Sequence, residues 1–193
     1  MKNKSFKDIA LPAIMLFIIA AVCTGLLAGT NLLTKDRIAQ LAVTAANEAK
    51  AAVLEADSFS DVKTLSVDGS ENIYYEAYDE SGSVIGYVFD VTVKSYGGDL
   101  SCMVGISAEE EKVTGVEITS ISDTPGLGMK ATGEDFLGQF IDKADGIGVN
   151  KNAPSDNEIQ AITGATISSQ AVTNAVNEAF STFNAVKAGV KNG

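Results

Sequence analysis

Histidine and tryptophan are both absent from this chain of 193 residues. Without His, the chain can build neither Ser-His-Asp nor Cys-His catalysis, and it has no His-ligated metal site. Its two cysteines, Cys23 and Cys102, are too few for a disulfide framework or a cysteine-ligated iron–sulfur cluster. Any chemistry in which the chain takes part must therefore draw most of its reactive groups from a cofactor, and we expect no catalytic acid, base or metal ligand.

Positive charge is scarce as well. The chain has 14 Lys and Arg against 25 Asp and Glu, which gives a formal net charge of −11. Nucleic-acid binding needs clustered Lys and Arg, and the sequence contains no such cluster. We therefore expect no nucleic-acid partner.

The two cysteines lie in different settings and are not expected to pair. Cys102 alternates with Val104 and Ile106, which predicts a small buried hydrophobe in a strand. Cys23 lies in an apolar N-terminal segment. Acylation of Cys23 is an alternative, but Val22 stands where a lipoprotein signal usually has a small residue.

That apolar segment runs from Ile9 to Thr34 without a charged residue, about 26 residues, which is long enough to cross a bilayer with some tilt. A cleaved signal peptide is the competing interpretation, although its apolar core is normally about half as long. We predict that residues 1–34 are a short cytoplasmic N-terminus and a retained transmembrane anchor. Gly25 and Gly29 form a small-xxx-small pair, which suits helix packing within a membrane complex but also fits ordinary glycine usage.

The charges beside the anchor predict its orientation. Lys2, Lys4 and Lys7 precede the apolar segment, and Lys35 and Arg37 follow it, so the positive-inside bias is slight. The terminal amine adds to the first group, and a long acidic domain can be translocated largely regardless of its charge. We predict a single-pass protein of the cell membrane with a cytoplasmic N-terminus and an extracytoplasmic C-terminal domain.

The rest of the chain predicts an α+β fold. Asp36–Asp57 lacks Gly and Pro and is rich in Ala, Glu, Lys and Gln, so residues 35–58 are expected to be a helical stalk. Residues 59–193 are expected to form one domain with a twisted, mainly antiparallel sheet and packed helices. Asp79–Gly82 has the composition of a hairpin turn, and four runs have the composition of strands: 73–78, 84–93, 101–106 and 113–121.

A helix is predicted near the C-terminus. Its apolar stripe recurs at steps of three and four residues: Val172, Ala175, Val176, Ala179, Phe180, Phe183 and Val186. The Ser and Thr residues just before this stripe are expected to be N-caps, and Gly164 permits a tight turn ahead of them. Free amides and the positive end of the helix dipole favour a phosphate there, but a capped helix without a ligand is an open alternative.

Two glycine-rich loops interrupt the predicted strands, namely Ser95–Asp99 and Asp123–Lys130. Gly-Gly, Gly-Asp and Pro-Gly are common turn formers, so each loop taken alone is also explained as an ordinary turn without a binding role.

The segment Thr163-Gly164-Ala165-Thr166 resembles the motif Asp-x-x-Ser/Thr-Gly-Ala-Thr of the FMN-binding domains of respiratory membrane complexes. The resemblance implies that a separate flavin transferase joins the Thr166 hydroxyl to the phosphate of FMN as a phosphoester. Thr163, Gly164 and Ala165 would be the recognition segment. Gln160 stands where the motif has Asp, so either the transferase tolerates an amide or modification is inefficient.

Both loops resemble the same family, which commonly carries Gly-Tyr-Gly-Gly and Glu-Thr-Pro-Gly-Leu-Gly. Ser95 replaces the first Gly of one loop, and Asp123 replaces the Glu of the other. The resemblance implies that these loops border the flavin ring and that the amides around Ser168 and Ser169 hold its phosphate. The matching loop residues are Tyr96, Gly97, Gly98, Thr124, Pro125, Gly126, Leu127 and Gly128.

The three motifs and the anchor together make the chain similar to the G subunits of Rnf complexes. The resemblance implies an electron-transfer subunit of a ferredoxin:NAD oxidoreductase that is coupled to sodium-ion or proton translocation and is not catalytic alone. Its implied partners are the D, A and E membrane subunits, with the flavin transferase for maturation. The alternatives are a C subunit of a sodium-pumping NADH:quinone reductase, which shares the motifs, and a cofactor-free anchored scaffold module.

Overall fold

The computed structural model describes residues 2–67 and 69–191, and the chain forms two compact units that meet at Ala45 and Ala46. Helix α1 (Lys2–Val53) makes up the first unit and enters the second. Its part from Ala10 onward is long and apolar enough to cross a membrane, which agrees with the predicted anchor. The helix ends at Val53 rather than at the predicted Asp57, because the N–H of Asp57 donates to the carbonyl of Tyr78 in the sheet instead of continuing the helix.

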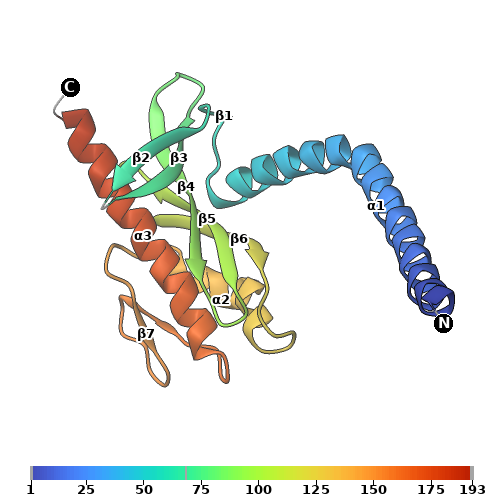
Figure 1. Cartoon of the computed structure of the whole chain (residues 1–193). Coiled ribbons are helices and arrows are strands. Elements are labelled where there is room, and N and C mark those ends of the chain that lie inside the picture. The colour runs from blue at the N-terminus through green and yellow to red at the C-terminus, as the bar shows by residue number, and fades with distance from the viewer. Residues whose placement is uncertain (1, 68, 192–193) are drawn as a thin grey trace. The chain divides into compact units, whose positions relative to one another are not determined.

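The second unit is built on an antiparallel sheet with the strand order β1-β3-β4-β5-β6, and β2 pairs with β3 (Figure 1). The four predicted strands are present as the four longest ones, so the predicted antiparallel sheet is confirmed. The two short strands before them were not predicted. The bounds are β1 Ser58–Phe59, β2 Lys63–Val67, β3 Ser70–Tyr78, β4 Val84–Lys94, β5 Asp99–Ser107 and β6 Val113–Ile121.

Helix α3 (Thr166–Lys191) covers one face of this sheet (Figure 1). All seven residues of its predicted apolar stripe are buried, which confirms the predicted amphipathic helix. The ring of Phe183 packs edge-on against the rings of Tyr87 and Phe89 at centroid distances of 5.7 and 6.4 Å. The main core therefore lies between α3 and the inward-facing residues of β4, β5 and β6.

The opposite face of the sheet is covered by the last turns of α1, within the second unit. Val53 and Leu54 pack there with Ala77, Val88 and Met103. A Cβ at Gly105 would lie 2.4 Å from the Val53 carbonyl oxygen, so glycine lets the helix end approach the sheet backbone closely. The second unit is thus a sheet between two helical layers, which confirms the α+β class.

A long connection between β6 and α3 carries the elements that sequence periodicity did not predict. It contains two 3₁₀ helices, one short α-helix and a parallel pair of short strands. Their bounds are η1 Gly128–Thr132, α2 Glu134–Leu137, η2 Gly138–Phe140, β7 Gly148–Asn150 and β8 Glu158–Gln160. Strand β8 ends at Gln160, so the turn that precedes α3 follows it directly in the chain.

Candidate functional site

The three glycine-containing segments singled out in the sequence meet at one pocket of about 600 Å³. One wall comes from the β4–β5 turn, one from the loop after β6, and one from the turn and first residues of α3. The pocket is lined by Tyr96, Thr124, Leu127, Gly128, Gly164, Ala165, Thr166, Ile167 and Ser168. The fold therefore joins segments that are distant along the chain into a single concave site.

Thr166 is the first residue of α3 and lines this pocket. The N–H groups of Thr166, Ile167 and Ser168 belong to the first helical turn, which has no earlier turn to supply carbonyl partners. The residue before the helix is Ala165, so the predicted Ser or Thr N-cap is wrong in position. Gly164, with φ of +81°, makes the left-handed turn that brings the chain into the helix.

Ser169 holds that turn together from behind. Its hydroxyl accepts a hydrogen bond from the N–H of Ile162 and donates to the carbonyl of Ala165, both at 3.0 Å. Its N–H also donates to the Ala165 carbonyl at 3.0 Å. The side chain is fully buried and outside the pocket lining, so Ser169 fixes the position of Thr166 without facing the pocket.

Asp123 is the residue that ties the three walls to one another. Its Oδ1 accepts the N–H of Gly97 at 2.6 Å, and its Oδ2 accepts the hydroxyl of Ser95 at 2.6 Å. The hydroxyl of Ser168, in the first turn of α3, donates to the same carboxylate. Burial opposes ionisation of this carboxyl, which is only 3% exposed, but the three hydrogen bonds outweigh it and hold its pKa below the usual value.

Glycine is required at two contacts around Asp123. A Cβ at Gly97 would lie 2.2 Å from the carbonyl oxygen of Ser122. A Cβ at Gly128 would lie 2.6 Å both from the Asp123 Cβ and from the Ser168 Oγ. Each side chain would occupy space that another wall of the pocket already fills, so these glycines permit the loops to close on one another.

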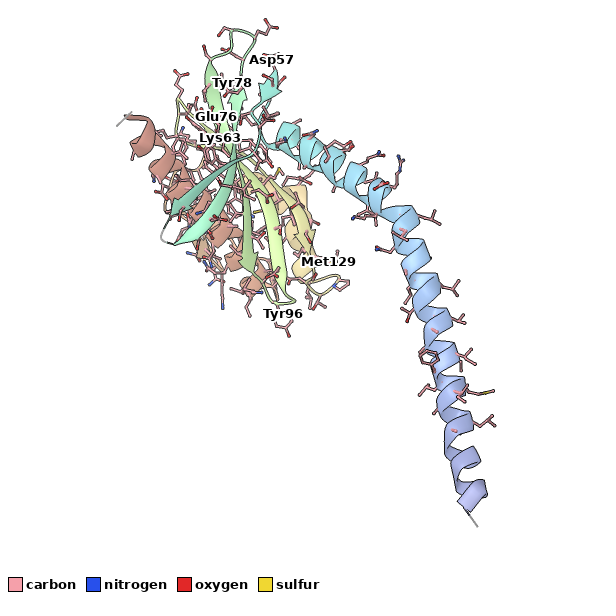
Figure 2. The ribbon with its side chains drawn as sticks, turned by 45° about the horizontal axis from the view of Figure 1, so that its top comes forward. Asp57, Lys63, Glu76, Tyr78, Tyr96 and Met129 are labelled. Carbon is pink, nitrogen blue, oxygen red and sulfur yellow. The ribbon has the colours of Figure 1, made fainter. Side chains whose placement is uncertain are left out.

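The mouth of the pocket is apolar and exposed. Tyr96, Leu127 and Ile167 are 69, 45 and 58% exposed although they are large hydrophobic residues. Figure 2 shows Tyr96 and Met129 toward one end of the second unit, whereas Lys63, Glu76 and Tyr78 lie toward the other. Among the residues that line the pocket none is charged. A helix N-terminus beside an apolar rim suits a ligand with a phosphate at one end and a flat aromatic ring at the other, as FMN has.

The remaining predicted site residues surround the pocket without lining it. Gly98 and Gly126 have φ of +142° and +79°, and they turn their loops together with Gly97 and Pro125. Thr163 lines a neighbouring open pocket of about 600 Å³ together with Gln160 and Lys130. The N–H of Gln160 donates to the side-chain oxygen of Gln139 at 2.7 Å, so the residue in the motif's Asp position belongs to this second pocket.

Sequence reasoning missed the structural role of Asp123 and Ser95. In the sequence both stand out only as departures from the family's loops, where they replace Glu and Gly. The sequence signal that could have indicated this role is a carboxylate at the start of one glycine-rich loop, Asp123, and a hydroxyl at the start of the other, Ser95. Cys102 behaves as predicted: it is fully buried in β5, and burial raises the pKa of its thiol to about 12.

Comparison with known proteins assigns both parts of the chain. Residues 95–181 match the family model of the FMN-binding domain, and residues 1–51 match that of the RnfG N-terminal region. The first match begins at Ser95 and includes all three walls of the pocket. The chain thus contains an FMN-binding domain, in the place where the pocket lies.

Relatives that match nearly the full length of the chain support the same assignment as the two family models. The chain is 34% identical to the G subunit of the ion-translocating oxidoreductase complex of Methanosarcina acetivorans, over 90% of this chain and 93% of the relative. It is 36% identical to the G subunit of the Na⁺-translocating ferredoxin:NAD⁺ oxidoreductase complex of Acetobacterium woodii, over 85% and 86%. The fold resembles Shewanella oneidensis NqrC with a TM-score of 0.52 at 19% identity, over 72% and 74% of the two chains. The length and identity of the matches show that this chain belongs to the family of G subunits of Rnf ion-translocating oxidoreductase complexes.

Proposed function

We propose that this chain is the membrane-anchored electron-transfer subunit of a ferredoxin:NAD oxidoreductase complex of the Rnf type and carries FMN covalently on Thr166. One observation carries the proposal: Thr166 opens α3 at the point where the three motif segments form one pocket. Membership in the family of Rnf G subunits and the match to the FMN-binding domain support the same assignment.

The first turn of α3 provides the phosphate site. The N–H groups of Thr166, Ile167 and Ser168 point toward the N-terminal end of the helix, where the dipole favours negative charge. The Thr166 hydroxyl becomes the ester oxygen, so this residue is an attachment point and takes no part as an acid or base. The bond keeps the cofactor on the protein while it exchanges electrons with neighbouring subunits.

The apolar rim provides the surface for the flavin ring. Tyr96, Leu127 and Ile167 supply exposed apolar area beside Thr166, against which a flat ring can pack. FMN supplies the electron-carrying chemistry when it is bound. The protein contributes the tether, the orientation of the ring and the electrostatic surroundings.

The anchor supports a proposal about location and assembly. We propose residues 1–34 as the cytoplasmic N-terminus and membrane anchor, 35–58 as the stalk and 59–193 as the extracytoplasmic FMN-binding domain. The α1 helix and the match to the RnfG N-terminal region support an anchor. The proposed partners are the D, A and E membrane subunits, and a flavin transferase for maturation.

Gln160 is proposed to be compatible with flavin transfer. Its side chain lies in the pocket next to Thr163, and its N–H is held by Gln139, so the turn before Thr166 is anchored without the motif's carboxylate. A Gln160→Asp variant should therefore gain FMN at about the same rate as the unaltered chain, and a much faster gain would show that Gln160 impairs the transfer.

The test of attachment is intact-mass spectrometry of the full chain co-expressed with a flavin transferase. The chain should gain the mass of FMN minus water, because the new phosphorus–oxygen bond replaces the hydroxyl hydrogen of Thr166 and one phosphate hydroxyl. Thr166→Ala should show no gain while its circular dichroism and melting temperature stay close to those of the parent. Thr166→Ser keeps a hydroxyl at the same place and is the matched control.

Absence of the gain from the unaltered chain, with a transferase that modifies a control substrate, would refute the covalent cofactor. That result would favour a scaffold module without flavin. Loss of folding in Thr166→Ala would instead assign the residue a structural role.

A further inference from the structure

We propose that Asp123 is a positioning residue that locks the three walls of the pocket together and whose buried negative charge lowers the reduction potential of the bound flavin. The inference rests on the proposed function, since it concerns the same pocket. It adds a residue outside the pocket lining and a reason for a carboxylate at that place.

The locking role follows from the geometry. Asp123 belongs to the loop after β6, and its carboxylate accepts hydrogen bonds from Ser95 and Gly97 of the β4–β5 turn and from Ser168 of α3. Asp123 is 3% exposed, so water cannot replace these donors readily. Hydrogen bonds to a charged acceptor are stronger than those between neutral groups, and a side chain that accepts from two other segments holds both of them to its own loop.

The electrostatic role follows from the position of the charge. The Asp123 Oδ2 would lie 2.7 Å from a Cβ on Gly128, and Ser168 touches the same carboxylate from α3. Gly128 and Ser168 both line the pocket, so the carboxylate lies one residue behind the pocket wall. The three salt bridges found among the described residues involve Lys63, Lys94 and Lys187, and Asp123 takes part in none of them.

A buried carboxylate without a cation affects an electron carrier in a predictable direction. Reduction of the flavin by two electrons with uptake of one proton adds one negative charge in the pocket, and the carboxylate repels that charge through protein of low dielectric constant. The reduced form is therefore disfavoured relative to the oxidised form. Charge near the ring is one of the means by which a protein sets the potential of its flavin.

Asp123→Asn separates the two roles. The amide oxygen can accept the N–H of Gly97 as before, and the amide NH₂ can donate to the hydroxyls of Ser95 and Ser168, so all three hydrogen bonds can be retained, with donor and acceptor exchanged in the two to serine. The charge alone is lost. Ser95→Ala is the matched opposite, since it removes one hydrogen bond and keeps the charge. Asp123→Glu keeps the charge and is the conservative control.

The experiment is a spectroelectrochemical titration of the flavin in the full-length proteins, with the FMN content of each measured by intact mass. We expect Asp123→Asn to retain the FMN mass gain and to shift the potential to a more positive value. Asp123→Glu and Ser95→Ala should keep the parent potential, and Ser95→Ala should lower the melting temperature. If Asp123→Asn does not fold, the smaller neutral variant Asp123→Ser serves for the same comparison.

An unchanged potential in the neutral variant would overturn the electrostatic role. An equal shift in Ser95→Ala would also overturn it, because loosening of the loops would then account for the effect. Absence of FMN from the parent chain itself would count against the proposed function rather than against Asp123.

Discussion

Gly128→Ala adds a single methyl group and should disrupt the assembly of the pocket. The φ of Gly128 lies outside the left-handed region, so alanine can adopt its backbone conformation. The added methyl group would nevertheless lie 2.6 to 2.7 Å from three atoms, one of Ser168 and two of Asp123. The substitution therefore tests the packing of the loop against Asp123 without adding backbone strain.

The expected destabilisation follows from these contacts. Inserting a methyl group into a tightly packed region costs about 1–3 kcal/mol. If Ser168 and Asp123 separate to make room, the loss of a hydrogen bond to a charged group adds about 1.5–3 kcal/mol. Because partial relaxation reduces both effects, we expect a net loss of about 2–4 kcal/mol. For a chain of this length that corresponds to a melting temperature roughly 5–15 °C lower.

The aromatic composition provides the assay. All of the chain's tyrosines lie between residues 74 and 96, and it has no tryptophan, so near-ultraviolet tyrosine signals report on the second unit alone. The melting of full-length Gly128→Ala is compared with that of Gly138→Ala. Gly138 has φ of −60° and ψ of −21°, and no atom lies within 4 Å of the position that an added methyl group would take, so alanine there should be neutral or stabilise by about 0.4–1 kcal/mol.

A Gly128→Ala protein that melts within about 1 °C of the parent would refute the reasoning, since the predicted effect is several times larger. A loss of similar size in Gly138→Ala would also contradict it, because the effect would then not depend on the contact with Asp123.

Two further predictions concern the core. The first uses a Cys23→Ser variant, in which Cys102 is the only thiol. Cys102 should react with a maleimide at pH 8 only after unfolding, because its thiol is buried and a pKa of about 12 leaves very little thiolate. Rapid labelling of the folded protein would contradict the buried position of Cys102. The second is that Phe183→Ala should destabilise the second unit by about 3–5 kcal/mol in urea unfolding, because it removes a fully buried ring. Phe183→Leu is the milder control, and equal losses in the two variants would contradict the edge-on packing of the ring against β4.

Much of the framework could be predicted from local patterns. The alternation of Cys102, Val104 and Ile106 predicts a strand with one buried face, and in the structure these three residues point into the core beneath α3. The spacing from Val172 to Val186 likewise predicts the helix that covers them. Such patterns are readable because each element buries one face, and burial imposes a period on the sequence.

The short elements could not be predicted in the same way. Strands β7 and β8 have three residues each, too few to show a period, and they pair in parallel across a long loop. The end of α1 at Val53 depends on its contact with Gly105 and Gly115 in the sheet, which nothing in the helical segment itself records. Tertiary contacts rather than local propensity decide these boundaries.

For the candidate site, too, some features could be predicted from the sequence and others depend on tertiary contacts. The sequence by itself determined an apolar anchor, an antiparallel sheet covered by a C-terminal helix, and three segments that resemble parts of one flavin-binding family. Each of these features depends only on residues that are close together in the sequence. Only the tertiary structure decided that these segments share a pocket, that Ser169 lies behind Thr166 rather than beside it, and that Asp123 joins the walls. The physical reason is that hydrogen bonds between Asp123 and residues more than twenty positions away depend on how the sheet and α3 pack, and no local period encodes that packing.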